Sequence, residues 1–221
     1  INRTFTTQEL GFETLKFNSV AAQMSRGKSE KTVAFAMSSV AATLAKFSMD
    51  VCLYMSQNFD FITLPAHLTT GSSIMPHKKN PDVFELIRGK CNKIQALPYE
   101  ITLITNNLPS GYHRDFQLLK EGLFPAIQNL KACLDIAIFS IKDIKVKDNI
   151  LADKKYDYLF TVDTLNEMVV AGMPFRDAYK AVAEQLENGT FQSPKETKHT
   201  HEGSINNLCL DEIKEKMKLA F

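Results

Sequence analysis

Two long stretches of regularly spaced apolar residues constrain the fold of this chain more than any other feature. In both, apolar side chains recur in steps of four and three, the spacing of the buried seam of a helix in a bundle. The first stretch is Val33, Met37, Val40, Leu44, Phe47, Val51 and Tyr54. The second is Leu119, Leu123, Ile127, Leu130, Leu134, Ala137, Ile141 and Ile144. We therefore predict two long bundle helices, one from about residue 31 to 58 and one beginning near residue 119.

A third long helix is predicted between these two. It starts at Pro81, buries Phe84, Ile87, Cys91 and Ile94, and is kinked or ended by Pro98. Beyond about residue 145 the predicted helices become shorter. They are Tyr156–Val170, Pro174–Glu187 and Asp211–Leu219. The pattern predicts an all-α chain, with a long-helix bundle in residues 1–144 and a small C-terminal helical domain in residues 145–221.

The overall charge excludes some classes of function. The 26 lysines and arginines nearly balance the 25 aspartates and glutamates, so no net charge favours nucleic acid or an acidic membrane surface. We also expect no membrane-spanning segment and no secretory signal. The four cysteines form no CxxC pair and read as buried thiols of a reducing compartment; they are Cys52, Cys91, Cys133 and Cys209. We therefore expect a cytoplasmic protein.

The loop GSSIMPHKKNPD, residues 71–82, concentrates groups that bind anions. It contains two serine hydroxyls and the charges of Lys78 and Lys79. Asn80 and Pro81 are typical of the N-cap and first residue of a helix, whose free N–H groups attract a carboxylate or phosphate. The loop is not a P-loop, because His77 replaces the glycine that precedes the lysine there. It is not a G-x-S-x-G nucleophile elbow either, because the second glycine is absent.

This loop resembles the signature GSSxMPxKxNP of the superfamily of fumarases, aspartases and argininosuccinate lyases. A second segment, LPSGYHRDFQLLKE at residues 108–121, resembles LPSxYxxDxQxxKE of the argininosuccinate lyases. The PFRDAY stretch, residues 174–179, is similar to the start of their C-terminal domain. From about residue 38 to 176 the chain thus resembles the later half of an argininosuccinate lyase. The resemblance implies an all-α fold of the fumarase/aspartase type.

The resemblance also implies a reaction and an assembly. Argininosuccinate lyases split argininosuccinate into arginine and fumarate by β-elimination, in arginine biosynthesis, and use no metal or organic cofactor. Removal of a proton beside a carboxylate creates a second negative charge, so the site must place cations and N–H groups around it. The family forms homotetramers around a bundle of twenty helices, with each active site built from segments of three subunits.

Three catalytic roles follow from the resemblance alone. Ser72, the first serine of the loop, would remove the Cβ proton as an activated hydroxyl. Lys78 would hold the succinyl carboxylates and stabilise the intermediate. Glu85 would orient a histidine and make it more basic, although a helix-surface carboxylate explains its presence as well.

Four further positions match substrate-binding residues of the family. Asn80 would share the succinyl carboxylates with Lys78. Tyr112 and Gln117 would act as neutral donors, and Lys120 as a partner of a carboxylate. On spacing, Gln117 and Lys120 are predicted to share one face at the start of the third helix.

Departures from the family pattern leave alternatives open. His77 resembles the MPHK of adenylosuccinate lyases, so a different succinyl adduct is a possible substrate. A non-catalytic oligomeric scaffold of the same fold is an alternative from another class. The histidine that partners Glu85 in the family lies in an earlier segment, so we expect a fragment that is inactive alone. His199 and His201 lack further ligands at metal spacing and favour a surface loop.

Overall fold

The computed structural model describes residues 1–220, and the boundary between two compact units falls between Lys147 and Asp148. Each unit is described by itself. The sequence pattern predicts two domains that divide after residue 144, and that division stays a prediction.

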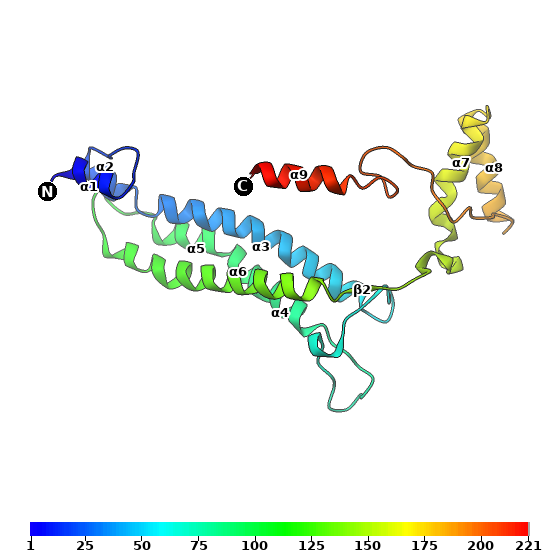
Figure 1. The fold of residues 1–221 in the computed structure, drawn as a ribbon, viewed down its shortest axis with the longest axis horizontal. Helices are drawn as coiled ribbons and strands as arrows, with labels where there is room; N and C mark the ends of the chain where they lie inside the picture. Colours follow the sequence, from blue (N-terminus) through cyan, green and yellow to red (C-terminus); the bar gives the residue numbers. More distant parts are fainter. Residues whose placement is uncertain (221) are drawn as a thin grey trace. The chain divides into compact units, whose positions relative to one another are not determined.

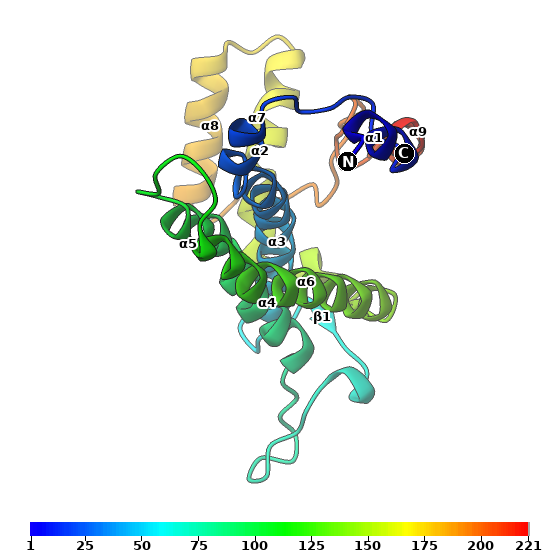
Figure 2. The ribbon, with the colours of Figure 1, turned by 90° about the vertical axis from the view of Figure 1, so that its left-hand side faces the viewer.

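Unit 1 is a bundle of long helices that lie side by side (Figures 1 and 2). Its main helices are α3 (Lys28–Tyr54), α4 (Asp82–Gln95), α5 (Leu97–Ile104) and α6 (Leu119–Ile141). The short helices α1 (Arg3–Glu9) and α2 (Ser19–Met24) precede them, and the 3-10 turns η1 (Ala66–Leu68) and η2 (Arg114–Gln117) lie in the connections. The antiparallel pair β1 (Ile62–Thr63) and β2 (Lys145–Val146) is the one sheet within residues 1–220. The predicted all-α long-helix bundle is confirmed.

Helix α3 buries only part of the face that was predicted: Met37 and Val51 are buried, and Leu44 and Phe47 pack partly against the core. Its buried residues are mostly small: Ala34, Met37, Ala41, Ala45, Ser48 and Val51. Val33 and Val40, predicted to lie in the seam, keep 45% and 44% of their surface exposed. Small side chains allow α3 and α4 to approach closely, so the spacing of large apolar residues indicated the buried face only in part. Val33 and Val40 belong to a second apolar face, which stays exposed within residues 1–220.

The predictions for α4 and α6 were better. Phe84, Ile87, Cys91 and Ile94 are all buried, and the helix is interrupted before Pro98, the second residue of α5. In α6 the buried positions largely follow the predicted seam: Leu119, Leu123, Ala126, Leu130, Cys133, Ala137 and Ser140. Large apolar residues dominate the buried face of α4, and Leu119, Leu123 and Leu130 mark that of α6, which is why the spacing of large residues indicated both faces.

A glycine fixes the start of α3. Gly27 has φ +88°, and a Cβ there would lie 2.4 Å from Cγ2 of Thr105 at the end of α5. Its backbone N–H donates to the Glu30 carboxylate at 2.9 Å, which satisfies one free donor of the helix terminus. Any larger residue at position 27 would push this end of the bundle apart.

Unit 2 is small and helical. Its elements are η3 (Ile150–Ala152), η4 (Lys154–Phe160), α7 (Thr161–Val170), α8 (Phe175–Glu187) and α9 (Leu210–Ala220). Helices α7 and α8 pack on each other around Leu165, Ala178 and Val182. The first predicted helix is therefore a 3-10 segment followed by an α-helix, and the other two are within one residue of their predicted bounds.

Two helical segments, Ser19–Tyr54 and Arg114–Ile141, are long and apolar enough to cross a membrane by length and composition. On that point the expectation that no stretch of this kind exists was wrong. Core helices of helical bundles pass the same test, and these segments contain α3 and α6, which supply much of the buried core of unit 1.

Candidate active site

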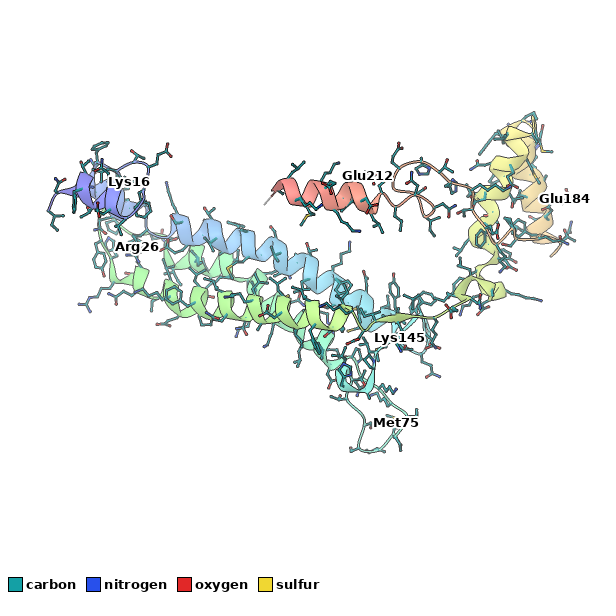
Figure 3. All side chains as sticks on the ribbon, in the orientation of Figure 1. Lys16, Arg26, Met75, Lys145, Glu184 and Glu212 are labelled. Atoms are coloured by element: carbon teal, nitrogen blue, oxygen red, sulfur yellow. The ribbon has the colours of Figure 1, made fainter. Side chains whose placement is uncertain are left out.

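The loop with the predicted catalytic residues leaves the helix bundle of unit 1 after η1 and returns to it at α4. It extends away from the bundled helices in both ribbon views, and Met75 marks it in Figure 3. Asn80 does not act as the N-cap of α4. Its backbone pairs with that of Thr70, and α4 begins at Asp82 with Pro81 as the N-cap. The predicted helix start was therefore one residue too early.

Ser72 lies in a small cradle of backbone donors. Its Oγ accepts hydrogen bonds from the N–H groups of Ile74 at 3.2 Å and Met75 at 3.1 Å. Ser72 is half-buried, whereas Ser73 is exposed. Two N–H groups aimed at one oxygen stabilise negative charge on it, which is what a serine alkoxide requires.

Three of the predicted residues line one cavity. The cavity, of about 650 Å³, lies between the end of α3, strand β1, the loop and the start of α4. Lys78, Asn80 and Glu85 line it, together with His77 and Lys79. Ser72 is not among its lining residues. The structure thus brings the two lysines, an amide and a carboxylate together in a space large enough for a small dicarboxylate.

Glu85 faces the end of α3 across this cavity. The electrostatics of Cys52 reveal that proximity: burial raises the pKa of the Cys52 thiol, the Arg88 guanidinium opposes the rise, and the Glu85 carboxylate adds to it. Arg88 also donates to Sδ of Met49 at 3.0 Å. Contacts between α3 and α4 therefore fix the helix that carries Glu85.

The second group of predicted residues lies around η2. Gln117 Nε2 donates to the hydroxyl of Tyr112 at 3.0 Å, and both side chains are exposed. Gln117 belongs to the 3-10 turn, whereas Lys120 is an exposed residue in the first turn of α6. The prediction that both share one face of the third helix was therefore wrong, because that helix begins only at Leu119.

The two groups lie at opposite ends of unit 1. In Figure 3, Met75 in the loop and Arg26 beside η2 mark these ends. Helices α4 and α5, of 14 and 8 residues, run between them and span about 33 Å at 1.5 Å per residue. One chain therefore does not bring Lys78 and Gln117 into the same site.

A residue given little weight in the sequence lies beside the second group. The Arg26 guanidinium is 5.6 Å from the ring centroid of Phe116 and 3.6 Å from the Glu30 carboxylate. Arg26 lies in the segment NSVAAQMSRG, far from Phe116 in the sequence, so no local pattern connects the two residues. The fold adds Arg26 to the surroundings of η2.

One histidine of unit 2 contacts a carboxylate, and a second lies beside it. His199 Nε2 lies 2.8 Å from Oδ1 of Asp163, and its ring is 5.8 Å from that of His201. Among residues 1–220, no group of three or more His, Cys, Asp or Glu side chains has the arrangement of a metal site. His199 thus links the stretch before α9 to α7.

Comparisons with known proteins agree with this geometry. Residues 2–96 match the protein family described as Lyase. An argininosuccinate lyase of Parabacteroides distasonis is 57% identical over 218 residues, which cover 99% of this chain and 49% of the relative. Among solved structures, a fumarate lyase:delta crystallin of Brucella melitensis superposes with a TM-score of 0.65 at 21% identity, over 85% of this chain and 43% of that one. A class II fumarase of Schistosoma mansoni gives 0.65 at 20% identity, over 80% and 36%.

The chain therefore shares the helical-bundle fold of these two solved structures. Residues 2–96 match the lyase family, and along nearly its whole length the chain is similar to argininosuccinate lyases. It spans about half the length of the curated relatives it matches.

Proposed function

We propose that the full-length protein containing this chain is an argininosuccinate lyase, which converts argininosuccinate into arginine and fumarate in arginine biosynthesis, without a metal or organic cofactor. The observation that carries the proposal is the identity of 57% to an argininosuccinate lyase along 99% of this chain. A cytoplasmic location follows from the same proposal, since it places the protein in a soluble biosynthetic route.

In the proposed reaction the loop begins the elimination. The Ser72 alkoxide takes the Cβ proton. The electron pair of the broken Cβ–H bond moves into the neighbouring carboxylate and forms a dianion. The N–H groups of Ile74 and Met75 stabilise the alkoxide, and Lys78 and Asn80 hold the carboxylates where the second charge develops. The electron pair of this dianion then forms the double bond of fumarate while the Cα–N bond breaks. The electrons of the Cα–N bond leave with the guanidino nitrogen, which is protonated by an acid outside this set of residues.

The arginine end of the substrate is assigned to the η2 group. Tyr112 and Gln117 are exposed and already hydrogen-bonded to each other, which orients them for a polar ligand. They lie about 33 Å from the loop along α4 and α5, so they are proposed to serve the loop of another subunit. This separation supports a homotetramer with shared sites, and so does the exposed apolar face of α3.

The alternative substrate is favoured by one observation. His77 lines the cavity beside Lys78, and the MPHK sequence is the adenylosuccinate lyase pattern. Incubation of the full-length protein with argininosuccinate and with adenylosuccinate, followed by fumarate absorbance, separates the two. Release of fumarate from argininosuccinate alone supports the proposal. Release from adenylosuccinate alone refutes it, and release from neither adduct favours the non-catalytic scaffold.

A further inference from the structure

A hydrogen-bonded neck closes the signature loop. The N–H of Thr70 donates to the carbonyl of Asn80 at 3.1 Å, and the N–H of Asn80 donates to the carbonyl of Thr70 at 2.9 Å. In addition, the Thr70 hydroxyl donates to the Asp82 carboxylate. The neck, defined as Thr70, Asn80 and Asp82, thus ties the beginning of the loop to the first residue of α4.

Little else attaches the loop. Within residues 1–220, the hydrogen bonds of residues 71–79 stay inside the loop: Lys78 N–H donates to the carbonyl of Met75, and Ser72 Oγ accepts from Ile74 and Met75. Residue 72 is half-buried and the rest of this segment is exposed. The position of the loop relative to the bundle is therefore set mainly at its neck.

The neck is close in sequence to both reacting groups. Ser72 follows Thr70 by two residues, and Lys78 precedes Asn80 by two. Asp82 lies in the first turn of α4, where the positive end of the helix dipole favours a carboxylate, so the acceptor for the Thr70 hydroxyl is held by a rigid element. A charge-assisted hydrogen bond from a hydroxyl to such a group is stronger than one between neutral partners.

We propose that Thr70 and Asp82 are positioning residues for the elimination reaction. Their hydrogen bond fixes the angle at which the loop leaves α4, and thereby aligns Ser72 and Lys78 with the succinyl end of the substrate. Neither residue touches the substrate. This inference rests on the proposed lyase function, but the hydrogen bond itself is testable without it.

The test compares three variants of the full-length protein that contains this chain. Thr70→Val removes the hydroxyl and keeps the shape, whereas Thr70→Ser keeps the hydroxyl. Thr69→Val is the matched control, because the Thr69 hydroxyl contacts only the nearby carbonyls of Pro65 and Ala66, at 3.5 and 3.4 Å. Each variant is assayed for kcat and KM, and for amide hydrogen exchange in peptides covering residues 70–82.

We expect Thr70→Val to lower kcat about tenfold with little change in KM, because Ser72 and Lys78 would no longer be aligned for the transition state. Amide hydrogen exchange in the loop should become faster. Thr70→Ser should keep both kcat and the exchange rate close to those of the wild type. Thr69→Val should match the wild type in both. Circular dichroism establishes that each variant keeps its helices.

Two outcomes would overturn the proposal: unchanged loop exchange in Thr70→Val, or equal loss of activity in Thr70→Val and Thr70→Ser. If the wild type releases no fumarate from argininosuccinate, the lyase function fails and the positioning role fails with it. Faster loop exchange in Thr70→Val would then still establish the hydrogen bond as the attachment of the loop.

Discussion

Gln117 donates a hydrogen bond of 3.0 Å to the hydroxyl of Tyr112, at the end of the bundle opposite the loop that carries Lys78. Within residues 1–220 the pair makes no side-chain hydrogen bond to a carboxylate, and neither residue lines the cavity at the loop. A rigid pair of helices separates the two places by about 33 Å, so no loop movement of ordinary size joins them in one chain. Contributions from different subunits are the simplest way to complete a site.

Complementation tests this arrangement. Full-length Lys78→Met and Gln117→Ala variants should each be nearly inactive, because each removes one half of every site. After their subunits are mixed and reassembled, activity should return to about a quarter of the wild-type value, the fraction of sites that combine both intact segments in random symmetric assemblies. The measurement is fumarate release before and after mixing. A mixture as inactive as its components would place both segments in the site of a single chain.

Ser72→Ala should abolish most of the turnover. We expect kcat in the full-length protein to fall by about two to four orders of magnitude, the range for loss of a general base, with KM nearly unchanged. Ser73→Ala is the control, because Ser73 is exposed and the N–H groups of Ile74 and Met75 donate to Ser72. If both variants lose activity equally, the hydroxyl of Ser72 has no special role in proton transfer.

The two neighbouring lysines should differ in importance. Both line the cavity, but Lys78 alone matches the lysine of the family signature. Lys78→Met should therefore reduce kcat/KM about a hundredfold, as loss of a placed charge in a site does, and Lys79→Met much less. Steady-state kinetics at two salt concentrations provides the measurement. Similar losses that shrink with added salt would mean that the general positive field of the loop matters, and not one placed ammonium group.

The candidate loop residues could be selected from the sequence because their pattern is local, and their catalytic roles stay predictions. Ser72, Lys78 and Asn80 occur in one short segment, and a fixed spacing of special residue types is enough to find them. The proposed role of Thr70 could not be predicted, because its hydroxyl reaches Asp82 only through the folded shape of the loop between them. The same limit applies to Arg26, whose neighbour Phe116 is distant in sequence.

The helices illustrate a similar division. Spacing identified the buried face of α4, where the large residues Phe84 and Ile87 fill the core. It identified the face of α3 only in part, because the fully buried Ala34 and Ala41 were missed and Val33 is half exposed. Hydrophobic spacing cannot tell whether a helix packs within its own chain through small residues or against another chain through large ones.

The buried thiols should make stability sensitive to alkaline pH. Burial, with the nearby Cys133 thiol, raises the pKa of Cys91 from 9.0 to about 12. Unfolding then releases a proton between these values, so the stabilising contribution of the neutral thiol is complete below pH 9 and is lost as the pH rises towards 12. Urea unfolding should therefore show that the chain has a higher free energy of unfolding than its Cys91→Ala variant below pH 9, and that this difference becomes smaller as the pH rises towards 12. A constant difference would show that Cys91 ionises equally in both states.

The last prediction is that this 221-residue chain, produced alone, self-associates but releases no fumarate from argininosuccinate. Val33, Phe35, Val40 and Phe139 are large apolar residues of α3 and α6 that stay exposed, and their burial favours association with further helices. The chain provides the loop and the η2 group, but it spans about half the length of the argininosuccinate lyases it matches. Analytical ultracentrifugation measures the oligomer, and Val40→Glu should weaken it by placing a charge in the apolar face. A well-folded monomer would contradict the packing argument, and measurable turnover would direct attention to His77 and His113 as catalytic histidines.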